Sequence, residues 1–149
     1  MEVFVGADYK GWDKKVELSG FLIEKNYEVI EQGSNDLNSN LDFNDAAIMI
    51  SKAVRENLGS RGILICDSAH GMTIQANRFK GIRAANCDSV GSARLAREHD
   101  DANVLCMSAG LMSINDMKAV SETFLNTDFE PLERRVRRIN RLDEREDYD

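Results

Sequence analysis

Apolar runs typical of β-strands alternate five times with helical patterns along the 149 residues of the chain. The β-type runs lie at residues 3–6, 27–30, 62–65, 82–85 and 103–107. Helical patterns follow them over about 12–26, from a cap at Asn44 or Asp45 to about 58, and over 72–79, 89–98 and 114–126. This alternation is typical of a parallel sheet covered by helices on both faces. We therefore predict an α/β fold of the Rossmann-like (flavodoxin-like) type, with three α/β/α layers around a five-stranded parallel sheet.

The same spacing predicts which helix faces are buried and where the chain turns. Apolar residues recur at helical spacing as Trp12, Val16 and Ile23 in the first helix and as Met117, Val120 and Phe124 in the fifth. Residues 32–41 are rich in turn formers and predict a polar loop. Pro131, the only proline, fits the first turn of a final helix. That helix is basic at first and acidic at its end. From its length, 1–149 is expected to be one domain, with a C-terminal helix and acidic tail over about 131–149.

Composition excludes several classes of partner. The net charge of -7 argues against binding of nucleic acid or of an anionic membrane surface. No apolar run approaches the roughly 18 to 20 residues needed to span a bilayer. No export signal is visible at the N-terminus. The three cysteines, Cys66, Cys87 and Cys106, are odd in number and widely spaced, so a disulfide framework and a structural zinc site are not expected. A reducing, cytoplasmic setting follows from this pattern.

Candidate chemistry lies where the predicted strands end. Ligands of open parallel sheets bind beyond the carboxyl ends of the strands, and Asp8, Cys66 and Asp67 all fall at such ends. Cys66 closes a buried strand and is followed by a tight turn that opens into a helix. Free N–H groups at a helix N-terminus favour a thiolate and bind anions. This combination favours an enzyme acting on a small phosphorylated or anionic substrate.

Each of these residues also has a simpler interpretation. A cysteine at the end of a buried strand is typical of inert core, which is the role expected of Cys87 and Cys106. His99 fits a histidine favoured by the dipole at a helix C-terminus. His70 fits an exposed turn residue, a donor to substrate or a proton relay, and its closeness to Cys66 argues against a Cys–His nucleophile pair. The arginines over 134–141 fit a solvated helix face with ion pairs.

Several segments together resemble a known family. They are Gly6-Ala-Asp8-x-x-Gly11, Asp42-Phe43, Gly62-Ile-Leu-Ile-Cys66, Gly71-Met-Thr-x-x-Ala-Asn77, Gly81-Ile-Arg-Ala-Ala85 and Arg97-Glu-His99-Asp-Asp-Ala-Asn103. In order and spacing, from about residue 2 to 142, they resemble the ribose-5-phosphate isomerase B and galactose-6-phosphate isomerase family. The resemblance implies a metal-free aldose–ketose isomerase of a phosphorylated sugar that works through a cis-enediolate and needs no cofactor. It also implies a homodimer or tetramer whose sites are completed by the partner's last helix.

The resemblance implies roles for particular residues. Cys66 would be the base, and His99 the acid that assists ring opening. The turn over 67–71 would cradle the oxyanion, and a cation on the last helix would bind phosphate. The positions implied to contact substrate are Asp8, Tyr9, Asp67, Ser68, Ala69, His70, Gly71, Asp100, Arg134 and Arg137; no metal site is implied.

The chain departs from the family pattern at several of these positions. Tyr9 and Asp100 replace a histidine and an asparagine, and the turn over 67–71 lacks two glycines. Asp67 places a negative charge near the expected oxyanion, and Ala69 resists the positive φ that an N–H cradle commonly needs. Gly110 and Glu133 stand where phosphate-binding arginines are usual.

These departures leave two further functions open. One is a partner or regulatory subunit of a heteromeric isomerase, which Asp67, Ala69 and Gly110 favour. The other is an isomerase with an altered substrate, either an unphosphorylated sugar or a tetrose or hexose. Cys66 together with His99 favours intrinsic activity. Asp8, Asp42 and Asp67 could also indicate a phosphoryl-accepting receiver domain, but Ser108-Ala-Gly110, directly after the fifth strand, offers no lysine.

Overall fold

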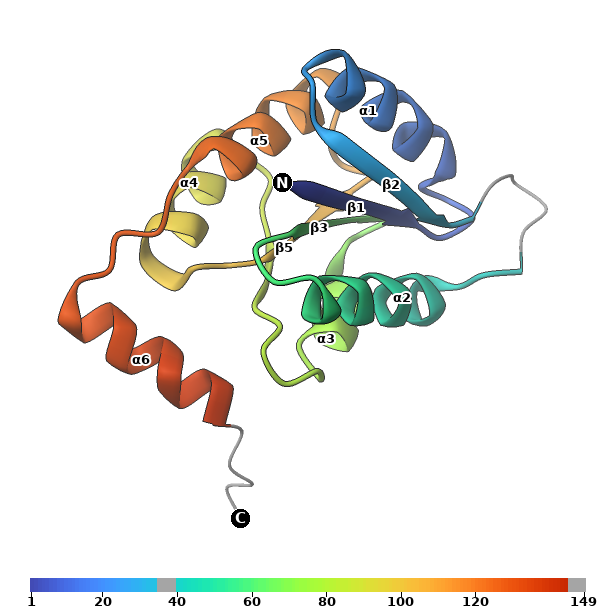
Figure 1. The fold of residues 1–149 in the computed structure, drawn as a ribbon. Helices are drawn as coiled ribbons and strands as arrows, with labels where there is room; N and C mark the ends of the chain where they lie inside the picture. Colours follow the sequence, from blue (N-terminus) through green and yellow to red (C-terminus); the bar gives the residue numbers. More distant parts are fainter. Residues whose placement is uncertain (35–39, 145–149) are drawn as a thin grey trace.

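Five parallel strands form the sheet, and helices connect them. The computed structural model describes residues 1–34 and 40–144 (Figure 1). The strands are β1 (Glu2–Ala7), β2 (Glu28–Gly33), β3 (Arg61–Cys66), β4 (Ala84–Asn86) and β5 (Val104–Ser108). Of these, β1, β3 and β5 are buried along most of their length. The helices are α1 (Trp12–Glu24), α2 (Phe43–Glu56), α3 (His70–Ala76), α4 (Val90–Asp100), α5 (Ile114–Asn126) and α6 (Glu133–Glu144). The sheet order is β2-β1-β3-β5-β4, with every pair parallel. The predicted flavodoxin-like α/β fold is confirmed.

Alternate residues of the central strands face two separate hydrophobic cores, as expected for a sheet covered on both faces. Val5, Ile63 and Met107 pack with α1, α4 and α5 on one face. Phe4 and Cys66 pack with α2 and α3 on the other. Figure 1 shows α1, α4 and α5 on one side of the sheet and α2 and α3 on the opposite side. The thiol of Cys66 therefore belongs to the α2–α3 layer.

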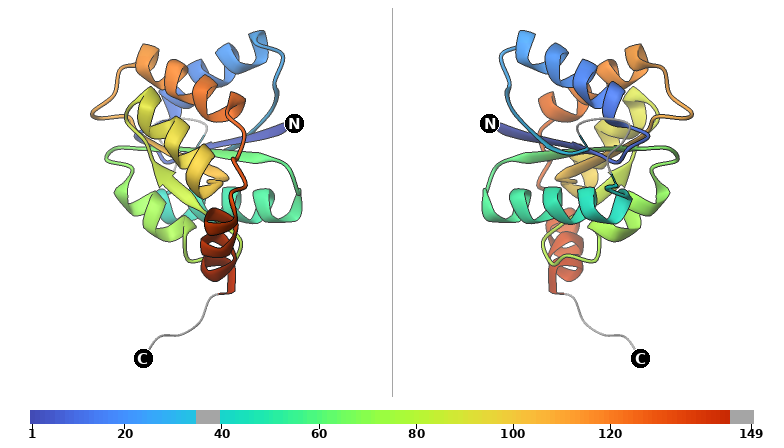
Figure 2. Two further views of the ribbon diagram at one scale, coloured as in Figure 1. Left: turned by 90° about the vertical axis from the view of Figure 1, so that its left-hand side faces the viewer. Right: turned by 90° about the vertical axis from the view of Figure 1, so that its right-hand side faces the viewer.

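The last helix stands apart from both layers. Figures 1 and 2 show α6 beyond the edge of the sheet at which the strands begin, next to the end of α4. The backbone N–H of Glu130 donates to the carbonyl of Glu98 at 3.1 Å, which ties the segment before α6 to α4. Within α6, Ile139 is the one buried residue. Most of this helix is therefore left uncovered by its own chain.

The structure corrects several local predictions. Val16 and Ile23 are 48% and 57% exposed, so they are not the buried face of α1. That face is made of Lys15, Leu18, Ser19 and Leu22 instead. The predicted buried face of α5 is confirmed, and so are the core positions of Cys87 and Cys106. The α1 prediction was wrong because a buried lysine, which donates from Nζ to the carbonyl of Ser34 at 2.6 Å, interrupts the apolar pattern.

Element ends differ by a few residues from the predicted ones. The N-cap of α2 is Asp42, not Asn44 or Asp45, because its carboxylate accepts from both of those N–H groups. The strand β2 runs on to Gly33, into the predicted loop over 32–41, and residues 35–39 of that loop lie outside the described residues. The helix α6 begins at Glu133, so Pro131 precedes its first turn. Of the predicted acidic tail, residues 145–149 also lie outside the description.

Gly11 sits where no side chain fits. A Cβ at this position would lie 2.5 Å from the carbonyl oxygen of Ile65. We expect Gly11→Ala to lower the free energy of unfolding by about 1–3 kcal/mol, because a backbone contact has to open. Gly20→Ala is the matched control, since nothing lies within 4 Å of that Cβ. In an exposed helix interior it should raise stability by about 0.5–1 kcal/mol. Urea unfolding of both variants checks the pair, and equal midpoints would contradict the contact.

Candidate active site

Asp8 and Cys66 meet at the point where the chain order of the sheet reverses. They follow β1 and end β3, two adjacent strands whose next connections lead to opposite sides of the sheet. Such a switch point opens a crevice beyond the carboxyl ends of the strands, and ligands of this fold class bind there. Cys66 is 4% exposed and Asp8 is 6% exposed. The two residues thus lie close together, as the sequence predicts.

The turn after Cys66 aims backbone N–H groups at the thiol. The N–H of Ala69 donates to Sγ of Cys66 at 3.2 Å. Ala69 is in the left-handed conformation with φ of 70°, immediately before α3. This conformation costs an L-residue roughly 1–2 kcal/mol. Ala69 thus adopts the positive φ that sequence analysis expected to be unfavourable for alanine. The full burial of its methyl group helps to compensate for this conformational cost.

Electrostatics at Cys66 differ from the sequence-based expectation. The neighbouring N–H groups of Ser68, Ala69 and Met72 lower the pKa of the thiol, as expected of a helix N-terminus. Burial has the larger effect, and the carboxylate of Asp8 adds to it, so the pKa is raised overall. The prediction that the turn favours a resting thiolate was therefore wrong. In the free protein the thiol is therefore neutral, and the N–H groups around it are placed to stabilise a negative charge when one forms.

Asp8 is held as rigidly as the thiol. Its Oδ1 accepts from the N–H groups of Lys10 and Gly11, each at 3.0 Å. Burial raises the pKa of this carboxyl group, while those two hydrogen bonds oppose the rise. Oδ2 has no hydrogen-bond partner among the described residues, so it is available to a hydroxyl group. Tyr9, next in the chain, is exposed at the same edge.

Asp67 turns away from the thiol and toward the end of β5. Its Oδ2 lies 3.6 Å from Nζ of Lys10, and its side chain is 61% exposed. A Cβ at Gly110 would lie 2.6 Å from Oδ1 of Asp67. The carboxylate therefore occupies space that exists only because residue 110 is glycine. The charge that sequence analysis placed near the oxyanion is partly neutralised by Lys10.

Lys14 is a residue of this edge that sequence reasoning missed. Its Nζ donates to the carbonyls of Ala109 and Met112 at 2.6 and 2.7 Å. The N–H of Ala109 in turn donates to the carbonyl of Cys66 at 2.7 Å. These bonds fix the segment after β5 against the cysteine turn. No sequence signal marks Lys14, because its partners lie 95 and 98 residues away.

The remaining predicted residues of the turn line the same edge. Ser68 is exposed, and its Oγ accepts from the N–H of His70 at 3.4 Å. Nδ1 of His70 lies 3.4 Å from Nδ2 of Asn86, the last residue of β4. The ring of Phe43 packs directly on Gly71.

Four predicted residues do not join this group. His99 and Asp100 end α4, and Arg134 and Arg137 lie on α6. The helix α4 runs back from the carboxyl edge of the sheet, so its last turn lies at the amino edge, beside α6 (Figure 1). Within one chain the predicted site is therefore split into two groups at opposite edges of the sheet.

The arginines on α6 differ from one another in their partners. Arg137 is exposed and lies 3.4 Å from Glu133, one turn earlier. Arg135 instead binds Glu130 at 2.9 Å and helps to hold the helix to its own chain. Weak exposed pairs of the first kind leave a guanidinium available to a ligand. On the basic face of α6, the guanidinium of Arg137 is therefore accessible to a ligand.

Comparison with known proteins gives a consistent result. The sequence profile of the family described as Ribose/Galactose Isomerase matches residues 3–142. The chain belongs to this family. A probable ribose-5-phosphate isomerase B from Mycoplasma genitalium is 35% identical over 94% of this chain and 92% of its own length. A 4-deoxy-4-sulfo-D-erythrose isomerase from a Clostridium species is also 35% identical, over 87% of this chain and 81% of its own. The ribose 5-phosphate isomerase structure from Thermotoga maritima superposes with a TM-score of 0.92, at 33% identity, over 97% and 98% of the two chains.

The described residues hold neither a side-chain cluster suited to a metal ion nor a helix suited to cross a membrane. Residues 1–34 and 40–144 contain no group of three or more His, Cys, Asp or Glu side chains placed to hold a metal ion. Over the same ranges, every helix is too short or too polar to cross a bilayer.

The charge of Asp8 adds to the rise that burial causes in the pKa of the Cys66 thiol. We expect Asp8→Asn to move the alkylation of Cys66 by iodoacetamide to lower pH, because removing a nearby negative charge lowers the pKa of the thiol. The measurement is the alkylation rate against pH, with Cys66→Ser as the blank. Asp13→Asn, an exposed change in the first turn of α1, is the control and should not move the profile. A profile at unchanged or higher pH for Asp8→Asn would contradict the coupling.

Proposed function

We propose that this chain is an aldose–ketose isomerase of a phosphorylated sugar of the ribose-5-phosphate or galactose-6-phosphate type. The observation that carries the proposal is the thiol of Cys66, buried beside Asp8 and contacted by the N–H of Ala69 at the switch point of the sheet. Membership of the ribose/galactose isomerase family supports the same reaction class. The reaction proceeds through a cis-enediolate, with no metal ion or cofactor in the proposed chemistry.

The thiol group is suited to a proton transfer between adjacent carbons. Once the thiol proton of Cys66 has passed to water, the thiolate takes the proton of the carbon next to the carbonyl and becomes a thiol again. The thiol then returns that proton to the other carbon, so that no atom is gained or lost and the thiolate is restored. The sugar oxygen becomes an oxyanion in between, and the N–H groups of the turn over 67–71 stabilise it. Asp8 and Tyr9 hold a sugar hydroxyl, and Ser68 donates from its own. His70 lies at the same edge.

A second copy of the chain supplies the rest of the site. His99, as the acid of ring opening, and Asp100 lie at the edge opposite Cys66, so they act on the substrate of a neighbouring subunit. The helix α6 carries Arg134 and Arg137 to the same place. Exposed Val136 and Leu142 on this helix support a partner packed against it. We infer a homodimer with shared sites, whose dimers are able to pair into tetramers.

Two alternatives remain as second candidates. The carboxylates of Asp8 and Asp67 lie near each other at this edge, and Lys10 pairs with Asp67 at 3.6 Å. This charge pattern suits a subunit that needs an unlike partner for turnover. The same charge pattern suits an altered substrate, either unphosphorylated or of another chain length. The Clostridium relative, named for a sulfonated tetrose, supports substrate variation within the family.

We place the protein in the cytoplasm. Cys66, Cys87 and Cys106 are all free thiols, which a reducing compartment maintains. Sugar phosphates as substrates are consistent with this setting. The proposed partners are therefore a small-molecule sugar phosphate and further copies of the chain, with no nucleic acid or membrane involved.

Cys66→Ser tests the base. We expect turnover of four- to six-carbon aldose and ketose phosphates to fall by about 100-fold or more, the scale of a lost general base, while substrate binding is retained. Cys87→Ser, which removes a buried thiol of the other core, is the control. Unchanged turnover by Cys66→Ser would end the role of the thiol. Thermal stabilisation by a sugar phosphate without any turnover in the parent protein would favour the subunit alternative.

Arg137→Ala tests the phosphate contact. We expect KM for the phosphorylated substrate to rise by about 10-fold or more, because a charge-assisted bond to phosphate is lost. The unphosphorylated sugar should be unaffected. Arg138→Ala, an exposed neighbour on α6, is the matched control. An equal effect on both sugars would refute the contact.

A further inference from the structure

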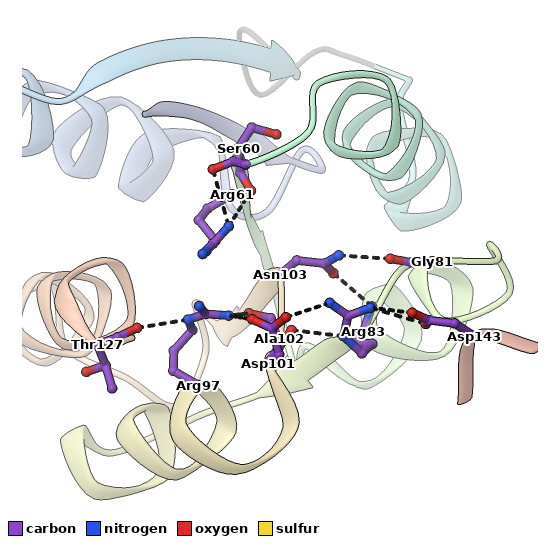
Figure 3. Close-up of polar contacts among 11 residues, drawn as sticks. Ser60, Arg61, Gly81, Arg83, Arg97, Asp101, Ala102, Asn103, Thr127 and Asp143 are labelled. Carbon is purple, nitrogen blue, oxygen red and sulfur yellow. Dashed lines mark hydrogen bonds and ion pairs between the residues drawn. The ribbon is translucent and has the colours of Figure 1, made fainter. Parts of the chain in front are cut away.

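Two sequence motifs, of which the proposed chemistry uses only His99 and Asp100, meet in the structure. The segment Gly81–Ala85 precedes and enters β4, and the segment Arg97–Asn103 joins α4 to β5. Asn103 bridges them, since its Nδ2 donates to the carbonyl of Gly81 at 2.8 Å and its Oδ1 accepts from the N–H of Arg83 at 2.8 Å. Figure 3 shows this polar cluster at the amino edge of the sheet.

Arg83 lies at the centre of the cluster and contacts two elements. Its Nε donates to the carbonyl of Asp101 at 2.9 Å, and its Nη2 lies 3.2 Å from the carboxylate of the same residue. Its Nη1 binds Asp143 of α6 at 2.9 and 3.1 Å (Figure 3). The guanidinium is 16% exposed, so these bonds are screened less than those on the surface.

Asp101 caps the C-terminus of α4, and its backbone conformation is fixed. It is in the left-handed conformation with φ of 46°, and its carboxylate also binds Arg97 at 2.7 Å. Arg97 in turn donates to the carbonyls of Thr127 and Ala102. His99 and Asp100 thus lie in a turn that is held on both sides.

In contrast to the end of α4, the helix α6 is held to the rest of the chain by few contacts. Arg135 at its start donates to the carbonyl of Glu98 at 3.3 Å, Ile139 is buried in its middle, and Asp143 at its end binds Arg83. Among the described residues, Arg83 is the partner of Asp143. The angle of α6, and with it the place of Arg137, depends on this terminal ion pair.

We propose that Arg83 is a positioning residue that sets the last turn of α4 and the end of α6 in fixed relation, so that His99 and Arg137 reach one partner site together. This inference rests on the proposed function, in which both residues act on the substrate of a second copy. Arg83 does not touch the substrate. It acts on the acid through Asp101 and on the phosphate cation through Asp143.

The contact with Asp143 is tested without disturbing α4. We expect Asp143→Ala to raise KM for the sugar phosphate about 10-fold with kcat changed less than twofold, because only the phosphate-binding helix is released. Glu144→Ala, which removes the neighbouring exposed carboxylate of the same helix, should leave both constants unchanged. Asp143→Glu should restore most of the lost affinity. Arg83→Gln, which releases both elements, should lower kcat as well.

Each other outcome overturns the inference in a distinguishable way. If Asp143→Ala equals Glu144→Ala while Arg137→Ala still raises KM, the positioning role fails and the proposed function stands. If Arg137→Ala has no effect either, the phosphate contact fails with it. A fall in kcat of Asp143→Ala that parallels a loss of dimer mass or of melting temperature would assign Asp143 to stability alone.

Discussion

Every strand of this sheet runs in the same direction, and each connecting helix has to carry the chain back. Residues that follow a strand therefore lie at the carboxyl edge of the sheet, and residues that end a connecting helix lie at the amino edge. Cys66 and Asp8 belong to the first class, while His99 belongs to the second. No local adjustment brings such groups together in one chain, because a strand of five residues already spans roughly 16 Å. In the function proposed above, chemistry that uses both groups is therefore assembled from two copies.

The resting state of the thiol reflects a competition between burial and backbone dipoles. Sequence position alone favours a thiolate, since α3 begins four residues after Cys66. The structure adds an apolar layer from α2 and α3 and a carboxylate at Asp8, and these raise the pKa of the thiol. A neutral thiol in a cradle of N–H groups is stable until a substrate brings charge to the site. The strained turn at Ala69 is the cost of holding that cradle open.

The sequence predicted well what depends on periodic burial. The five strands, the apolar face of α5 and the placing of Asp8 beside Cys66 all follow from apolar spacing and from parallel topology. The face of α1 could not be predicted, because Lys15 is buried through carbonyl partners in another segment. Lys14 and Arg83 were beyond reach for the same reason, since their partners are distant in the chain. The orientation of Asp67 depends on Gly110, 43 positions later by residue number, and no local pattern carries that information.

The contact between Asp67 and Gly110 has a consequence for exchange of residues between this chain and its relatives. The carboxylate fills the volume in which any side chain at residue 110 would begin, so the two positions are not independent. A side chain placed at residue 110 forces the exposed carboxylate of Asp67 to rotate away from the end of β5, whereas glycine at residue 67 leaves that volume to a longer side chain at 110. The two positions are therefore coupled, and a redesign of substrate preference at this edge has to consider them together.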